Sequence, residues 1–311
     1  MRLEIQKAVR KAVPILIGIY GPTGSGKTLS ALLLASGLAP TKKVVLIDSE
    51  PPRARIHADN PRAVNALPDG FDVIDLDAPY EPKRFVEAID LCESRGYEVC
   101  IIDSLTDAWS GVGGCEDMKE QTKSWNKPKL ENKRMRDRIK ATRTMHVICC
   151  FKAHEKTVIV EGEINPKTGK PKQEYKSLGM QAETEKNNLF PLLIVFSVDA
   201  DTHLATAKKV TPEPLQPAFN EPRLLRPEDG LLLRKWNDSA PSEGGFDQLA
   251  KRAKAEALNG VEAYRRYFQS LTKKQKAWLV KHGHEDNKFD AEQTDLAAQG
   301  VEQEQPEEDE V

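Results

Sequence analysis

Short apolar runs alternate with amphipathic stretches through the first half of the chain. Strand-length runs rich in β-branched and other apolar residues lie at 15–20, 44–48, 71–76, 99–102 and 146–151. Between them, apolar side chains recur at helical spacing in 27–38, 84–94 and 129–142. Apolar strands that alternate with helices predict an α/β fold, with a mainly parallel central sheet covered on both faces.

The pattern changes after residue 151. Residues 156–176 predict a protruding hairpin with a basic tip, and 192–198 and 203–210 predict two further strands. A Ser-, Pro- and Gly-containing linker precedes stretches with helical spacing at 246–259, 261–269 and 271–282, the last with Thr272 as its N-cap. We therefore expect a core over residues 1–238, a small helical segment over 239–289 and an acidic, disordered tail over 290–311.

Composition adds only modest limits. The chain has 311 residues, of which 39% are hydrophobic and 30% charged, and its net charge of −2 favours no class of charged partner. Its five cysteines show no metal-binding spacing, and no apolar run is long enough to cross a membrane. These features predict a cytoplasmic protein that makes no membrane contact.

The strongest chemical signal is a glycine-rich run between the first predicted strand and helix. It fits the P-loop pattern at every defined position and reads Gly21-Pro22-Thr23-Gly24-Ser25-Gly26-Lys27-Thr28. Such a loop turns backbone N–H groups toward a phosphate, and Lys27 would reach the β- and γ-phosphates. The Thr28 hydroxyl would bind Mg²⁺, so the sequence predicts an ATP and Mg²⁺ site.

Acidic residues end two later strands. Asp103 ends the run 99–102 and is predicted to hold Mg²⁺ with Thr28. Glu50 follows the run 44–48 and is the candidate general base, while Asp48 is its competitor. Parallel strands bring their carboxyl ends to one edge of the sheet, where phosphates bind, so both acids are expected near the P-loop.

These motifs resemble the RecA-like ATPases. Leu46-Ile47-Asp48-Ser49-Glu50 is similar to that family's catalytic-glutamate strand, and Ile102-Asp103-Ser104 is similar to its Walker B strand. The resemblance implies a sensor after 146–151, either Lys152 or His154. It also implies a homo-oligomer in which Lys208 and Lys209, on a late strand, reach the ATP of a neighbouring subunit.

The same resemblance implies single-stranded DNA as a partner. The family's DNA-binding loops would correspond to 107–114, which contains Trp109, and to the hairpin. Hairpin residues suited to phosphate contact and base stacking are Lys167, Lys170, Lys172 and Tyr175. The overall likeness is to compact phage-encoded, Sak-type recombination ATPases and phage nucleotide-binding proteins. It implies recombination or annealing in a phage-infected or prophage-bearing bacterium, with a single-strand-binding or annealing protein as a possible partner.

Other functions stay open at this point. An ATP-dependent motor, helicase or loader would use the same nucleotide site, and so would a switch that binds only proteins. A GTPase is disfavoured because Asn126-Lys127-Pro128-Lys129 lacks the acid of the guanine-binding motif. The acidic residues after 301 are interpreted either as a solubilising tail or as a DNA mimic that competes for the chain's own basic surface.

Overall fold

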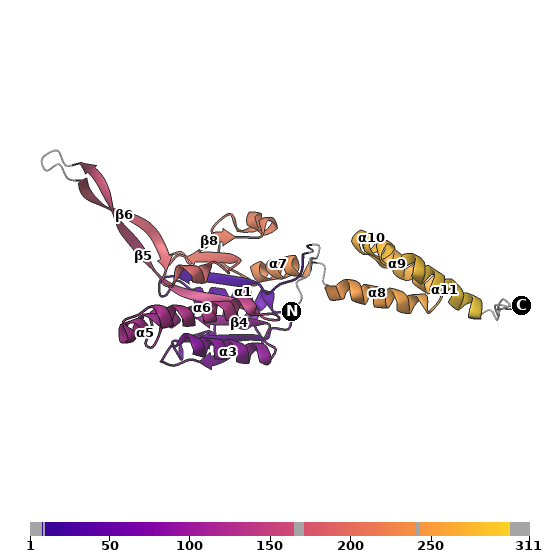
Figure 1. Ribbon diagram of the computed structural model, residues 1–311, viewed down its shortest axis with the longest axis horizontal. Helices are drawn as coiled ribbons and strands as arrows, with labels where there is room; N and C mark the ends of the chain where they lie inside the picture. Colours follow the sequence, from indigo (N-terminus) through magenta and orange to yellow (C-terminus); the bar gives the residue numbers. More distant parts are fainter. Residues whose placement is uncertain (1–7, 9, 165–170, 241–242, 299–311) are drawn as a thin grey trace, which may run out of the picture. The chain divides into compact units, whose positions relative to one another are not determined.

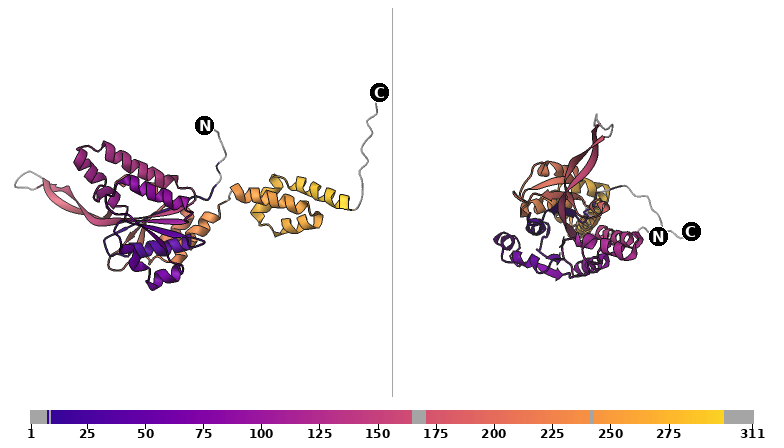
Figure 2. Two further views of the ribbon diagram at one scale, coloured as in Figure 1. Left: turned by 90° about the horizontal axis from the view of Figure 1, so that it is seen from below. Right: turned by 90° about the vertical axis from the view of Figure 1, so that its left-hand side faces the viewer.

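The chain folds into two compact units. The computed structural model describes residue 8 and residues 10–164, 171–240 and 243–298. Val13–Asn237 forms one unit, and the described residues on either side of it belong to the other (Figures 1 and 2). The first unit contains the central sheet and every residue predicted to bind nucleotide.

The central sheet of the first unit is mainly parallel, as predicted. Its strands follow the order β3-β2-β4-β5-β1-β7-β8. Six of the described strands run parallel to one another: β1 (Leu16–Gly21), β2 (Val44–Asp48), β3 (Asp72–Asp75), β4 (Val99–Asp103), β5 (His146–Ile164) and β7 (Ile194–Val198). The edge strand β8 (Ala205–Val210) is antiparallel to β7, and β6 (Pro171–Ala182) is antiparallel to β5.

Each core strand buries both of its faces. In β2, Val44 and Leu46 join the hydrophobic cluster under α1 (Lys27–Leu38) and α7 (Pro227–Asp238). The alternate residues Val45 and Ile47 join the cluster under α3 (Pro82–Ser94) and α6 (Asn126–Ala141). Because successive side chains of a strand point to opposite faces, continuous apolar runs are what a sheet covered on both sides requires.

Two glycines let the helices on one face approach closely. A Cβ on Gly37 of α1 would overlap the carbonyl oxygen of Pro227, and a Cβ on Gly230 of α7 would overlap that of Leu34. Only glycine permits this backbone-to-backbone contact. It lets α7 pack directly against the carboxyl-terminal end of α1, the helix that follows the P-loop.

Shorter elements complete the first unit. They are η1 (Arg53–His57), α2 (Pro61–Ala66), α4 (Asp107–Ser110), α5 (Cys115–Thr122), η2 (Lys186–Leu189) and η3 (Glu213–Phe219). Within the predicted loop 107–114, Asp107–Ser110 is a short helix, and the Trp109 ring stacks on Trp125 at 5.4 Å. Among the described residues, no helix combines the length and apolar character needed to cross a membrane.

The strand β5 continues far beyond the sheet. A separate strand was expected to end at residue 151, but β5 runs without a break to Ile164 and pairs with β6 from Ala153↔Ala182 onward. No glycine or proline interrupts residues 152–160, so nothing ends the strand there. We call this two-stranded extension, residues 153–164 and 171–182, the arm (Figure 1).

The second unit is helical. Its helices are α8 (Glu243–Ala257), α9 (Val261–Ser270), α10 (Lys273–Lys281) and α11 (His284–Ala298), and Thr272 caps α10 in a reciprocal capping box with Gln275. Residues 290–298, assigned above to a disordered tail, are helical instead. Ala291 is buried in this unit, and Asp295 accepts a hydrogen bond from the Val261 N–H at the start of α9. The acidic residues after 301 lie outside the described residues.

Candidate functional site

The P-loop connects β1 to α1 and forms a tight backbone cradle. Gly24 and Gly26 have φ angles of 83° and 89°, which L-residues rarely adopt. A Cβ on Gly21 would lie 2.7 Å from the Ser25 hydroxyl oxygen, so this position also requires glycine. The buried Ser25 hydroxyl has no hydrogen-bond partner in the described part of the chain. A cradle with an unsatisfied buried hydroxyl suits a ligand rich in hydrogen-bonding oxygens.

Lys27 begins α1 and its ammonium group returns over the loop. Nζ donates a hydrogen bond to the carbonyl oxygen of Pro22 at 2.8 Å. Burial lowers the pKa of Lys27, and the nearby carboxylates of Asp103 and Glu50 raise it in part. The cation is therefore partly desolvated, which strengthens its attraction for a phosphate.

Thr28 and Asp103 meet at the edge of the sheet. The Thr28 hydroxyl donates to Asp103 Oδ2 at 2.5 Å. Burial raises the pKa of Asp103, while the Thr28 hydrogen bond and the Lys27 charge lower it. Asp103 pairs in register with Asp48 of the neighbouring strand β2. The sheet thus brings together the hydroxyl and the carboxylate that were predicted to share a metal ion.

Asp48 organises the backbone that follows β2. It is 2% exposed, and its two carboxylate oxygens accept hydrogen bonds at 2.9 Å from the N–H groups of Glu50 and Ala54. Both oxygens are therefore engaged in shaping the loop after β2. Asp48, the alternative candidate for the general base, therefore holds the backbone of this loop in place.

Glu50 lies at the mouth of the site between two cations. Its carboxylate accepts from the Arg53 guanidinium and lies 2.6 Å from Lys152 Nζ. Burial acts to raise the pKa of Glu50, but the hydrogen bonds from Lys152 and Arg53 outweigh it and lower the pKa overall. Glu50 is therefore ionised at neutral pH, as a proton acceptor must be.

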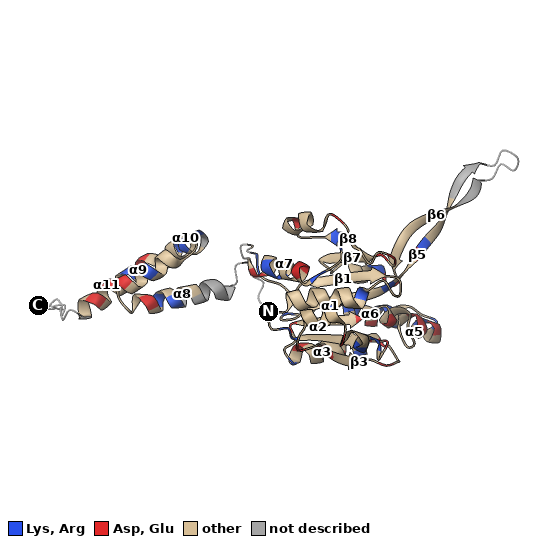
Figure 3. Ribbon diagram, turned by 180° about the vertical axis from the view of Figure 1, so that it is seen from behind, with Lys and Arg blue, Asp and Glu red and all other residues tan. Residues whose placement is uncertain are grey.

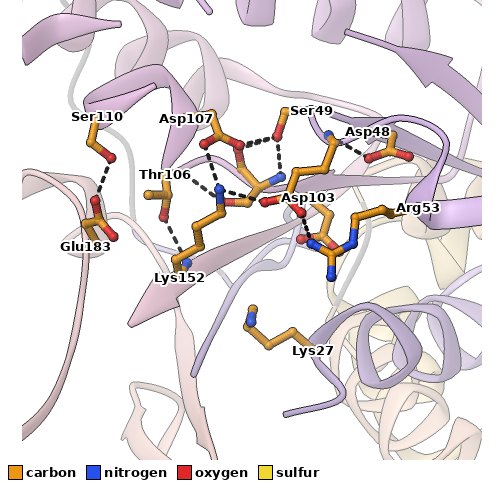
Figure 4. A network of polar contacts seen from close by, with 12 residues as sticks. Lys27, Asp48, Ser49, Arg53, Asp103, Thr106, Asp107, Ser110, Lys152 and Glu183 are labelled. Atoms are coloured by element: carbon orange, nitrogen blue, oxygen red, sulfur yellow. Dashed lines mark hydrogen bonds and ion pairs between the residues drawn. The ribbon is translucent and has the colours of Figure 1, made fainter. Parts of the chain in front are cut away.

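Lys152, rather than His154, is the sensor candidate that reaches this site. Lys152 Nζ lies between Glu50 and Asp107, at 2.9 Å from Asp107 Oδ1 (Figure 4). Its backbone N–H donates to the Thr106 hydroxyl at 2.9 Å. His154 is two residues further along β5, exposed at the start of the arm. Lys152 and His154 are two residues apart, so strand alternation places both side chains on the same face and the sequence pattern cannot choose between them. The contact of Lys152 with Glu50 identifies Lys152 as the better candidate.

A cleft of about 260 Å³ runs along these groups. It contains the predicted residues Lys27, Thr28, Glu50, Asp103 and Lys152, together with P-loop residues Thr23, Gly24 and Gly26. Sequence reasoning assigned no role to Ile56 or His57, which line the cleft from η1. Asp107, the first residue of α4, was also without an assigned role, although its position four residues after Asp103 was a usable signal.

Lys208 and Lys209 lie elsewhere. Because β8 is antiparallel to β7, Lys209 pairs with Val195 near the start of β7, at the opposite end of that strand from the P-loop. Lys209 Nζ donates to the carbonyl oxygen of Phe190, and the Lys208 side chain is exposed. Neither lysine lines the cleft of its own chain.

Of the predicted DNA-binding residues, Tyr175 is the one whose side chain the structure describes. It is 74% exposed on β6 and pairs across the arm with Ile159, itself 57% exposed. Lys172 lies on β6, and Lys167 and Lys170 fall outside the described residues.

The arrangement fits a magnesium-bound nucleoside triphosphate. Mg²⁺ binds oxygen ligands and keeps waters and substrate phosphates around it, so one hydroxyl and one carboxylate are sufficient from the protein. Thr28 and Asp103 supply these, and the glycine cradle with Lys27 supplies the donors for phosphate oxygens. In the described part of the chain no cluster of three or more His, Cys, Asp or Glu offers a competing metal site.

Comparison with known families gives one match. Residues 14–185, more than half of the chain, match the family described as an AAA domain. Among solved structures, one similar chain comes from a study of a prototypical ATPase from the type III secretion system of pathogenic bacteria. It is 11% identical, with 92% of this chain and 72% of that chain covered and a TM-score of 0.36. No curated protein matches the sequence.

Proposed function

Because the chain belongs to the AAA-domain family and its core is a P-loop ATPase domain, we propose that it hydrolyses ATP with Glu50 as the general base. The observation that carries the proposal is one cleft that holds Lys27, the Thr28–Asp103 pair and an ionised Glu50. Mg²⁺ would be held by Thr28 and Asp103, where it would neutralise phosphate charge.

The protein's own groups account for the remaining chemistry. The glycine cradle and Lys27 bind and orient the phosphates. Glu50 orients a water and accepts its proton at a carboxylate oxygen. Lys152 places a cation beside that carboxylate and near the cleft, where negative charge develops during transfer of the terminal phosphoryl group. These are the parts that a P-loop ATPase needs.

We extend the proposal to single-stranded DNA as a partner at the arm. Tyr175 and Ile159 form an exposed, uncharged pair on one face, which suits base stacking. The exposed lysines Lys156 and Lys176 lie on the arm between this pair and the central sheet. Figure 3 colours Lys and Arg blue. Lysines close to an exposed aromatic ring are suited to contacting a phosphate backbone and its bases.

DNA-dependent hydrolysis tests this assignment. We expect single-stranded DNA to raise the ATPase rate, with weaker stimulation at higher salt because phosphate contacts release counterions. Tyr175→Ala should weaken DNA binding by about 1–3 kcal/mol, measured by fluorescence anisotropy of a labelled oligonucleotide. Leu178→Ala, which removes another exposed apolar side chain from β6, serves as the control. Equal affinity of both variants and the wild type would remove the arm from the DNA site.

A homo-oligomer with Lys208 and Lys209 acting on a neighbouring ATP remains part of the proposal. Since these lysines lie outside their own cleft, their action on ATP requires a second subunit. The variant with both replaced by alanine should bind ATP yet hydrolyse it slowly. Mixing it with Glu50→Gln should restore turnover, because each variant supplies the group that the other lacks. If the mixture were no more active than each variant alone, Lys208 and Lys209 would not act on the ATP of a neighbouring subunit.

The biological setting follows from the same proposal. A DNA-stimulated ATPase of this size suits recombination or single-strand annealing in a phage-infected or prophage-bearing bacterial cytoplasm, alongside a single-strand-binding or annealing protein. Strand displacement from a forked duplex would favour a motor or helicase instead. ATP turnover that ignores DNA would favour a nucleotide switch that acts on proteins.

A further inference from the structure

Asp107 is a buried carboxylate with contacts on both sides of Glu50. It is 7% exposed at the first residue of α4. Its Oδ2 accepts from the hydroxyl of Ser49, the residue before Glu50 in the chain, at 2.6 Å. Its Oδ1 accepts from Lys152 Nζ at 2.9 Å, and the same ammonium lies 2.6 Å from Glu50 Oε1. One carboxylate thus holds both the Ser49 side chain, next to the proposed base in the chain, and the lysine that pairs with that base (Figure 4).

The start of α4 holds Lys152 at two points. Thr106 accepts from the Lys152 backbone N–H, and Asp107 binds the ammonium at the other end of the side chain. A lysine side chain has several rotatable bonds, so fixing both ends removes most of its freedom. Ser49 is held as firmly, because its hydroxyl also accepts from the Ser104 N–H at 2.8 Å.

We infer that Asp107 is a positioning residue for ATP hydrolysis, which aims the Glu50 carboxylate through Lys152 and Ser49. The inference rests on the proposed role of Glu50 as base. Asp107 does not line the nucleotide cleft, so it acts through its neighbours rather than on the substrate. A displacement of about 1 Å in a reacting group can cost about 100-fold in rate, which is the scale on which such support acts.

Substitution of Asp107 should separate turnover from binding. Asp107→Asn keeps the side chain's shape and removes the charge that orients Lys152. We expect kcat for ATP to fall about 10- to 100-fold while KM and the Kd of a fluorescent ATP analogue change by less than about threefold. Ser49→Ala, which removes only the second contact, should lower kcat in the same direction by less. Asp117→Asn, which alters a nearby acid bonded to the Gly113 N–H, is the matched control and should retain wild-type kcat.

A double-mutant cycle tests whether Asp107 acts on Glu50 through Lys152. If Asp107 acts through Lys152, adding Asp107→Asn to Lys152→Gln should lower kcat by less than about threefold further, because the partner is already lost. Independent, multiplicative losses would overturn the inference, as would a wild-type kcat for Asp107→Asn.

A crystal structure of Asp107→Asn keeps the two proposals distinguishable. We expect the Lys152 ammonium to leave the 2.6 Å contact with Glu50 and the Glu50 carboxylate to be displaced or disordered. Unchanged positions of both side chains would overturn the positioning role even if the wild type hydrolysed no ATP. If the wild type hydrolysed no ATP, Glu50 would not be the base. The positions of Lys152 and Glu50 in the Asp107→Asn crystal structure would still test the positioning role of Asp107.

Discussion

Lys27→Ala should weaken ATP binding severely. The Lys27 ammonium is partly desolvated, and its neighbours include the Pro22 carbonyl and the carboxylates of Asp103 and Glu50. Without this cation the phosphates would enter a cleft lined by three acidic residues, Asp48, Glu50 and Asp103. Truncating one partner of a buried charge pair costs about 2–5 kcal/mol, so Kd for Mg-ATP should rise about 30-fold or more. Isothermal titration calorimetry measures this change directly.

Lys43→Ala supplies the control for that titration. Lys43 precedes β2 at the opposite end of the strand from Asp48, so its removal alters the net charge equally without touching the cleft. Its Kd should match the wild type. Retention of tight Mg-ATP binding by a folded Lys27→Ala protein would contradict the phosphate site itself, and with it every role assigned to the cleft.

Glu50→Gln should leave ATP bound but almost unhydrolysed. The amide keeps the size of the side chain and one acceptor oxygen, but it cannot take a proton from water. General-base catalysis contributes about 10²–10⁴-fold, so kcat should fall by that factor while Kd for ATP changes little. Single-turnover assays with radiolabelled ATP separate binding from chemistry.

The acidic limb of the pH profile adds a second check on Glu50. Its pKa lies below the ordinary value because hydrogen bonds from Lys152 and Arg53 outweigh burial. Activity should therefore persist as pH falls through the ordinary glutamate range and be lost only below it. Arg53→Gln removes one of these donors, so the pKa should rise and the limb should move to higher pH. A Glu50→Gln enzyme with wild-type kcat would assign the base elsewhere.

Local sequence patterns were sufficient for the fold class and the phosphate cradle. Apolar runs such as 44–48 predict strands buried on both faces, because no polar side chain interrupts them. The P-loop spacing predicts the cradle because its glycines adopt backbone angles closed to other residues, as Gly24 and Gly26 do. The Thr28–Asp103 contact followed from the rule that parallel strands end at one edge.

Where local signals were weak, the predicted boundaries shifted. Nothing in residues 152–156 marks the point at which β5 leaves the sheet, so the arm's continuity with the core strand was not foreseen. The acidic composition after residue 290 favoured disorder, but burial of Ala291 and the contact of Asp295 with α9 stabilise a helix as far as Ala298. Tertiary contacts outweighed composition there.

By itself, the sequence determined that this chain carries a P-loop on a mainly parallel sheet, with acids at the edge where phosphates bind. The period of the apolar residues and the spacing of the P-loop residues are properties of consecutive positions, so both can be seen in the sequence. Only the tertiary structure decided which groups surround Glu50. Arg53 is a local partner three residues after Glu50. Lys152 and Asp107 lie far from Glu50 in the chain, and their positions depend on strand order and helix packing. A charge network of this kind forms between segments far apart in the chain, and no local pattern encodes it.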